Sequence, residues 1–236
     1  MRILSMETSS FPASVSIFED GKIIAENYIN TKFTHSQTLM PMVSSVFDFT
    51  KINLSDIDLI AVSEGPGSFT GVRIGIATAK GLAVPGKIKC MGISSLEALA
   101  FNLYDNNGEK LIYSCIDARV GQCYNAVFRL INGTMERICD DRVISDADLK
   151  TEIESLDTTD NLWIVGDYAE KVATLTDRNV RVAGFNLMYQ KASSVALAAY
   201  KSYKPEENYS AAEVQPKYLQ LPQATRELNK RKKENI

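Results

Sequence analysis

The chain has 236 residues and a formal net charge of −3, with 45% hydrophobic and 23% charged residues. This size fits one large domain or two small ones, and the proportions of hydrophobic and charged residues are ordinary for a soluble globular protein. The charge excludes a protein that binds nucleic acid through an overall basic character, and no apolar run reaches the ~18 residues of a membrane span. Residues 1–4 lead directly into a strand pattern without the apolar core of a signal peptide, so we expect a cytoplasmic protein without a membrane partner.

The cysteines and the single histidine limit the kinds of metal site and catalytic site that this chain can form. The four cysteines, Cys90, Cys115, Cys123 and Cys139, have no CxxC spacing and fall in apolar or strand-like segments, so we expect small buried hydrophobic side chains. His35 is the only histidine. A site with two or three histidine ligands therefore cannot be built from this chain. A Ser-His-Asp triad would have to use His35, whose surroundings indicate the capped start of a helix.

The first half of the chain alternates between strand and helix patterns. Residues 3–8, 14–18 and 23–29 have strand patterns, and Asp20-Gly21 predicts a hairpin turn between the last two. The elements expected next are a helix over 36–49, a strand over 58–62, a helix after a glycine-rich turn at 65–75, a strand over 89–93 and a helix over 94–103. Three antiparallel strands followed by alternating helices and strands match the ribonuclease-H-like, actin-like ATPase fold, an α/β class.

The second half repeats the opening pattern weakly after a polar, turn-rich stretch at residues 105–109. Strand patterns recur over 111–117, 122–128 and 135–139, and they are followed by a helix over 146–156, a strand over 162–165 and helical patterns over 168–175 and 193–203. We therefore expect two actin-like lobes, each a mixed sheet flanked by helices. The N-terminal lobe would span 1–105, the smaller C-terminal lobe 110–210, and a C-terminal segment with a basic tail 211–236.

The run Gly-Pro-Gly-Ser-Phe-Thr-Gly at residues 65–71 stands between an apolar strand and an apolar helix. Glycine permits close backbone approach, Ser68 or Thr70 can cap the helix, and amides at a helix N-terminus bind anions. The run is either a phosphate or carboxylate cradle or only a tight turn, and spacing alone favours the tight turn. It lacks the lysine of a P-loop and the acidic residue of a dinucleotide-binding fingerprint.

Two helices carry more apolar surface than contact with one sheet requires. The helix after the glycine turn has Arg73 and Lys80, seven residues apart, as its only charged residues, and the helix over 36–49 has two adjacent apolar stripes. Either the helices cover each other and the sheet, or they leave a docking patch for another chain. The candidate patch residues are Leu39, Met40, Val43, Phe47, Arg73, Ile74, Ala77, Lys80 and Gly81.

Four segments, at residues 3–9, 65–75, 117–124 and 215–219, occur together in an order that resembles a known family. They are similar to the bacterial TsaB (YeaZ) family of tRNA threonylcarbamoyladenosine biosynthesis proteins, which are related to TsaD and to M22-like glycoproteases. The match over 65–75 is long and specific. The resemblance covers essentially the whole chain and is strongest over the first 125 residues.

The resemblance implies a non-catalytic accessory subunit rather than an enzyme. Such a subunit works with the catalytic paralogue TsaD and the ATPase TsaE to attach threonylcarbamoyl to the adenosine beside the anticodon, so it meets tRNA through the complex. It docks through the two helices, either on a second copy as a homodimer or on TsaD as a heterodimer. The paralogue binds its metal through His-x-x-x-His, whereas here Leu39 stands four residues after His35, so we expect no metal ligands and no catalytic residues.

One departure from the family and two rival hypotheses remain. The family's first strand usually ends in aspartate, but here it ends in Glu7. The first rival is a metal-dependent nucleotide hydrolase or M22-like peptidase, which would bind ATP or ADP weakly with Mg²⁺. The loop residues of that site would be Glu7, Thr8, Ser9, Gly65, Gly67, Ser68, Thr70, Asp117 and Arg119. The second rival is a tRNA-binding module that uses the basic tail over 226–236.

Overall fold

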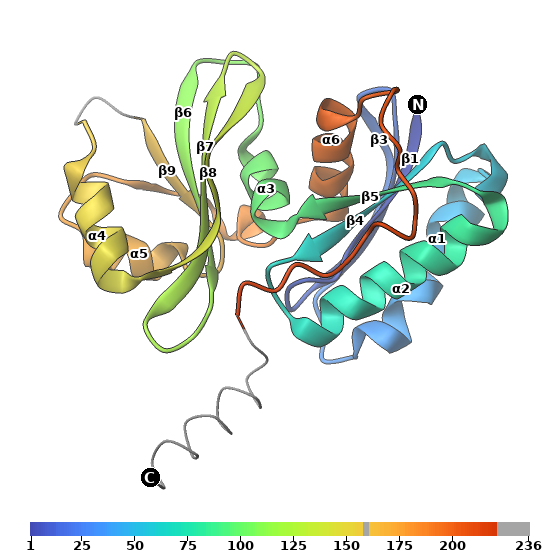
Figure 1. Ribbon diagram of the computed structural model, residues 1–236, viewed down its shortest axis with the longest axis horizontal. Coiled ribbons are helices and arrows are strands. Elements are labelled where there is room, and N and C mark those ends of the chain that lie inside the picture. Colours follow the sequence, from blue (N-terminus) through green and yellow to red (C-terminus); the bar gives the residue numbers. More distant parts are fainter. Residues whose placement is uncertain (158–160, 221–236) are drawn as a thin grey trace, which may run out of the picture.

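The computed structural model describes residues 1–157 and 161–220, which form two lobes that are each built on a five-stranded mixed sheet (Figure 1). The strand order is β3-β2-β1-β4-β5 in the first lobe and β10-β9-β6-β7-β8 in the second. In both sheets two antiparallel hairpins are extended by two parallel strands. The expected duplication of a three-stranded opening and the expected α/β class are therefore confirmed.

The first sheet begins with β1 (Arg2–Glu7), β2 (Ala13–Glu19) and β3 (Lys22–Ile29). Asp20 and Gly21 have φ angles of 46° and 88°, as the predicted tight hairpin requires. The parallel strands β4 (Leu59–Gly65) and β5 (Lys89–Ser94) complete the sheet. Because the central strands β1, β2 and β4 are buried along nearly their whole length, both faces of this sheet need a cover of helices.

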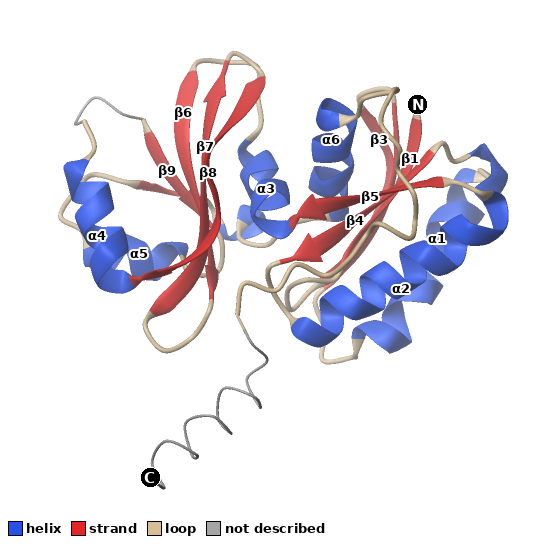
Figure 2. Ribbon diagram, in the orientation of Figure 1, coloured by secondary structure: helices blue, strands red, loops and turns tan. Residues whose placement is uncertain are grey.

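Helices on opposite faces supply that cover (Figure 2). α1 (His35–Thr50) and α2 (Phe69–Gly86) pack side by side over one face, in a core that includes Leu4, Val15 and Ile60. α3 (Ser95–Ala100) and α6 (Ala192–Ser202) pack on the other face. Ser68 caps α2 as expected, since its Oγ accepts a hydrogen bond from Gly71 N at 3.2 Å.

The second lobe follows the same plan with shorter helices. Its elements are β6 (Glu109–Asp117), β7 (Gln122–Ile131), β8 (Thr134–Ser145), α4 (Asp146–Ser155), β9 (Leu162–Val165), α5 (Ala169–Leu175) and β10 (Arg181–Val182). The sequence pattern predicts a strand that ends at residue 139, but β8 continues to Ser145. Two register shifts in its pairing with β7 accompany this continuation. Short 3-10 helices lie at Leu54–Asp56, Phe101–Leu103 and Phe185–Leu187.

The chain crosses between the lobes twice. α3 contacts strands of both sheets, and α6 packs on β1 and β2 of the first sheet. The sequence pattern predicts a second lobe over residues 110–210, but α6 packs against the first lobe because the apolar face of its Val195, Ala196 and Ala199 completes that core. The last sixteen residues, including the basic tail over 226–236, lie outside the described residues.

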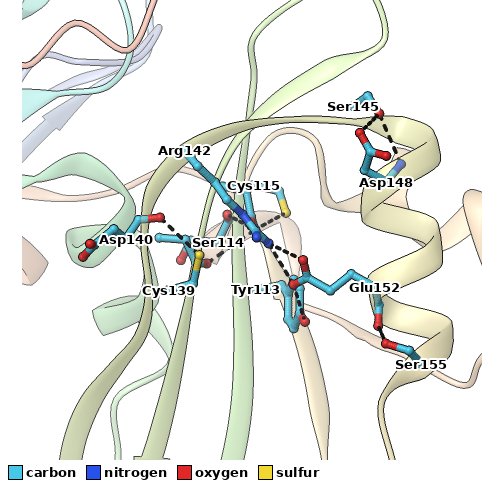
Figure 3. A network of polar contacts seen from close by, with 12 residues as sticks. Tyr113, Ser114, Cys115, Cys139, Asp140, Arg142, Ser145, Asp148, Glu152 and Ser155 are labelled. Atoms are coloured by element: carbon cyan, nitrogen blue, oxygen red, sulfur yellow. Dashed lines mark hydrogen bonds and ion pairs between the residues drawn. The ribbon is translucent and has the colours of Figure 1, made fainter.

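A polar network ties the second sheet to α4 (Figure 3). Arg142 of β8, Glu152 of α4 and Tyr113 of β6 form its centre. Cys115 and Cys123 are fully buried nearby, and Cys90 is buried in the first lobe; Cys139 is only partly buried. The expectation of buried cysteines therefore holds for three of the four. Among the described residues, no helix is both long and apolar enough to cross a membrane.

Candidate functional site

A cavity of about 800 Å³ lies between the two lobes. The first lobe contributes the loop after β1, the segment before α1 and the glycine turn at the start of α2. The second lobe contributes the end of β6 and Asp167, and residues 217–220 close one side. Six of the nine predicted loop residues line this cavity, and they are Ser9, Gly67, Ser68, Thr70, Asp117 and Arg119.

Glu7, Thr8 and Gly65 do not line the cavity. Glu7 is 1% exposed, and its carboxylate accepts hydrogen bonds from Ser9 N and from Ser63 Oγ. Burial raises the pKa of the Glu7 carboxyl above its ordinary value. Thr8 Oγ1 donates to the carbonyl of Gly71 at 2.8 Å. Of the predicted loop residues, these three therefore contribute nothing to the cavity wall, and the carboxylate of Glu7 is directed to Ser63 on the neighbouring strand β4 instead.

The glycine turn packs against the chain itself. Ser68 N donates to the carbonyl oxygen of Ser9 at 2.7 Å. A methyl group on Gly67 would overlap the same oxygen, and one on Gly71 would overlap the carbonyl oxygen of Thr8. Glycine is thus required at both positions for close contact with the loop after β1. These contacts account for the glycines as a tight turn, and binding of an anion at the same turn stays a prediction.

Two carboxylates face the cavity from the second lobe. Asp117 N donates to Asp167 Oδ1 at 2.9 Å, and Arg119 N donates to Asp117 Oδ1 at 2.7 Å. Asp167 is exposed, but the surrounding cavity wall partly desolvates its carboxyl, and this desolvation, helped by the negative charge of Asp117, raises the pKa of Asp167. No sequence signal points to Asp167, since it follows a four-residue strand without any motif. The next loop residues, from Arg119 to Gly121, are all left-handed, and Val120 is 93% exposed.

His35 begins α1 at the edge of the cavity, as the sequence predicts for a capped helix start. Its Nε2 lies 2.9 Å from the carbonyl oxygen of Ser10, so one ring nitrogen is directed at the backbone rather than at a serine hydroxyl. Across residues 1–157 and 161–220, no three His, Cys, Asp or Glu side chains gather in a group that could hold a metal ion.

The candidate docking residues on α1 and α2 divide by burial. Met40 is 49% exposed, and Arg73, Ala77 and Gly81 are also exposed. Phe47, Ile74 and Lys80 are partly buried. Leu39 and Val43 are 1% and 2% exposed and lie in the core. Their assignment to a docking patch is therefore wrong, because their stripe of α1 is the one that faces the sheet.

Residues 209–218, which we call the C-terminal strap, cover one flank of α2 (Figure 1). Cys90 N donates to the carbonyl of Tyr209 at 2.8 Å, and Lys217 N donates to the carbonyl of Glu64 at 2.7 Å. Val214 is 4% exposed and joins the core beneath α2. Part of the apolar surplus of α2 is thus buried by the chain itself.

Comparisons with known proteins agree with this architecture. A family model described as "TsaD: tRNA N6-adenosine threonylcarbamoyltransferase" matches residues 22–226. TsaB of Escherichia coli (strain K12) is 37% identical over 129 residues, which is 55% of each chain. TsaB of Haemophilus influenzae is 26% identical over 227 residues and 93% of each chain. The chain spans only about half of the E. coli relative's length in that match.

Solved structures give the same result. YeaZ from Pseudomonas aeruginosa has a TM-score of 0.80 and 26% identity, with 92% of this chain and 99% of that chain covered. The ethanolamine utilization protein EutJ from Carboxydothermus hydrogenoformans, at 12% identity and a TM-score of 0.52 over 84% of this chain and 89% of that one, shows the fold alone. The predicted two-lobed actin-like fold is confirmed. The chain therefore belongs to the TsaD family of tRNA N6-adenosine threonylcarbamoyltransferase relatives, in which it resembles the TsaB proteins.

Proposed function

We propose that the chain is a non-catalytic accessory subunit for threonylcarbamoyl transfer to the adenosine beside the anticodon of tRNA. It would bind and activate the catalytic relative TsaD, in concert with the ATPase TsaE, and would meet tRNA through that complex. It would contribute binding rather than chemistry, because its contacts would hold the catalytic partner in an active conformation. The names of its TsaB relatives support a place in this pathway.

The observation that carries the proposal is the pair of positions His35 and Leu39. In the catalytic paralogue two histidines four residues apart on this helix bind the metal. Here the second position is a leucine that is 1% exposed and packed in the core, and the ring of His35 contacts the Ser10 carbonyl. With leucine at the second position, α1 carries only one of the two residues that such a metal-binding pair requires.

The partner would dock on the exposed side of α1 and α2, which we call the docking face and define by Met40, Arg73, Ile74, Ala77, Lys80 and Gly81. The two helices lie side by side on the same face of the first sheet (Figure 2). Small and apolar side chains between two cations suit a protein interface better than a solvated surface. In isolation the same face would form a homodimer.

Size-exclusion chromatography with light scattering tests this proposal on the full chain, alone and mixed with the TsaD protein of the same organism. We expect a homodimer that converts to a heterodimer. Ala77→Glu, at an exposed position of α2, should abolish both assemblies while the circular dichroism spectrum stays unchanged. Lys22→Glu, at the exposed start of β3, is the matched control. A chain that ignores TsaD, or an Ala77→Glu variant that still binds it, refutes the proposal.

Nucleotide binding in the cavity is a second candidate, favoured by the convergence of Ser68, Asp117 and Arg119 on one hollow. The first-lobe acid does not fit a metal-nucleotide site, since Glu7 is enclosed and hydrogen-bonded within the sheet. We therefore propose binding of ATP or ADP without hydrolysis. Calorimetry with ADP and Mg²⁺ tests it: heat of binding that Asp117→Ala removes supports the site, and titrations without heat refute it.

A further inference from the structure

The exposed side of α2 carries positive charge only. Residues Phe69–Gly86 contain Arg73 and Lys80 and no acidic residue. Seven residues of helix place these two side chains on one stripe, ~10 Å apart along the axis. Ala77 and Gly81 lie between and beside them and are exposed. The stripe is therefore a pair of cations set among small side chains.

Two aromatic rings hold the guanidinium of Arg73 in place. Its central carbon lies 3.9 Å from the ring centre of Phe69 and 5.6 Å from that of Tyr218, and the two rings stack at 4.6 Å. Nε donates to Tyr218 Oη at 2.6 Å. Within the described ranges no carboxylate forms an ion pair with Arg73. A stacked arginine keeps its remaining donors oriented, so it loses little freedom when it binds a carboxylate.

Lys80 is anchored by the same strap. Its Nζ donates to the carbonyl of Ala212 at 3.5 Å, and among residues 1–157 and 161–220 it too has no ion pair. The acid of the strap, Glu213, accepts from Asn208 at 3.5 Å, and the strap's lysine, Lys217, pairs with Glu64. Both cations of the stripe are therefore positioned by this chain but left for another molecule to neutralise.

A second copy of this chain supplies the wrong charges. An isologous dimer places the same surface on both sides of the interface. The described part of α1 offers one carboxylate, Asp48, whose Oδ2 accepts from Ser44 Oγ at 3.4 Å. From these two helices, two copies would thus bring four cations and two carboxylates together, and like charges across an interface oppose binding.

We propose that Arg73 and Lys80 select a partner protein with two carboxylates about 10 Å apart in an apolar surface, in preference to a second copy of this chain. This inference rests on the proposed function, because it assigns the charges of the same docking face. RNA phosphates would also pair with two cations. The neighbouring Ile74, Ala77 and Met40 favour a protein, since they offer a phosphate backbone nothing to bind.

The test compares Arg73→Gln, Lys80→Gln and their double variant with Lys22→Gln, an exposed lysine outside the docking face. Analytical ultracentrifugation gives the dissociation constants of the homodimer and of the complex with the TsaD protein, at low and high NaCl. The double variant should weaken the complex about three- to ten-fold, the size of two exposed ion pairs, and should reduce its salt dependence. It should also tighten the homodimer, and the control should change neither constant.

Each other result counts against the inference. Equal weakening of homodimer and complex would mean that the cations pair with a second copy. Loss of tRNA binding with unchanged affinity for the TsaD protein would assign them to phosphates. If the wild-type chain forms no complex with the TsaD protein, the proposed function fails; the inference fails separately if neutralising the two cations does not tighten the homodimer.

Discussion

Nη2 of Arg142 in β8 donates hydrogen bonds to both carboxylate oxygens of Glu152 in α4, at 2.8 and 2.7 Å (Figure 3). The same guanidinium donates to the side-chain oxygen of Asn125 from Nε and Nη2 at 3.0 and 2.8 Å. Tyr113 Oη donates to Glu152 Oε1 at 2.9 Å. One carboxylate thus joins α4 to the strands β6 and β8 of the second lobe, and Arg142 extends the network to β7.

Removing that carboxylate should destabilise the second lobe. Glu152→Ala leaves the half-buried Arg142 without its counter-charge and the buried Tyr113 hydroxyl without its acceptor, so we expect the free energy of unfolding to fall by about 1–3 kcal/mol. Urea unfolding followed by circular dichroism measures it. Glu154→Ala on the same helix is the control, since its ion pair with Lys150 is exposed and 3.7 Å long. Equal losses in the two variants would contradict the role given to Glu152.

Glu7 should make stability depend on pH. Burial holds the pKa of its carboxyl above the ordinary value of 4.5, although bonds from Ser63 and Ser9 act in the opposite direction. An acid whose pKa is higher in the folded state costs stability once it ionises. That cost is absent below pH 4.5 and complete above the folded-state pKa.

Glu7→Gln removes this ionisation, so the variant should gain thermal stability relative to the wild type as pH rises from 4.5 to 7.5. Differential scanning fluorimetry at several pH values gives the difference in Tm between the two proteins. Taking the difference cancels every other group that titrates in both. A difference that stays constant with pH would show that Glu7 does not titrate in this way.

Two glycines of α2 make a matched pair, since Gly71 near the start of the helix is buried and Gly81 is exposed. A methyl group on Gly71 overlaps the Thr8 carbonyl, whereas one on Gly81 meets nothing within 4 Å. Gly71→Ala should therefore cost about 1–3 kcal/mol of unfolding free energy. Gly81→Ala should gain about 0.5–1 kcal/mol, because alanine favours helix more than glycine does. Denaturant unfolding of both variants decides the matter, and a tolerated Gly71→Ala would remove the packing explanation of the glycine turn.

The strap should contribute to the first lobe's stability. Val214 is 4% exposed in the core beneath α2, so Val214→Ala should lower the free energy of unfolding by about 1–3 kcal/mol. It should also speed proteolysis of the strap. Glu213→Ala, at the exposed neighbouring position, should leave both measurements unchanged. A Val214→Ala variant as stable as the wild type would mean that the strap is not part of the core.

Local patterns in the sequence predict most elements of this fold. The Asp20-Gly21 turn gives the first hairpin, and the residues around Ser68 give the start of α2. The repeated three-strand opening predicts two lobes, since hairpins depend on residues that are close in the sequence. The gathering of Ser9, Ser68 and Asp117 at one cavity follows from this topology.

Long-range contacts are what the sequence could not supply. α1 has two apolar stripes, and only packing decides that Leu39 and Val43 face the sheet. The strap has no repeating pattern of apolar residues that would predict its structure. Its position on α2 depends on side chains more than a hundred residues away, as the Arg73–Tyr218 contact shows. The direction of Glu7 is set by Ser63 on a neighbouring strand.

The return of α6 to the first sheet makes the second lobe an insertion within the first. Until residues 192–202 have left the ribosome, Ile3, Phe18, Leu59 and Ala61 lack the helix that covers them. The strands of the second lobe, from residue 109 to residue 182, are contiguous and precede α6 in synthesis. Domains generally fold as units during translation. The first lobe therefore begins to be synthesised before the second lobe but can finish folding only after it. Until α6 is made, one apolar face of the first sheet lacks that helix and is accessible to chaperones.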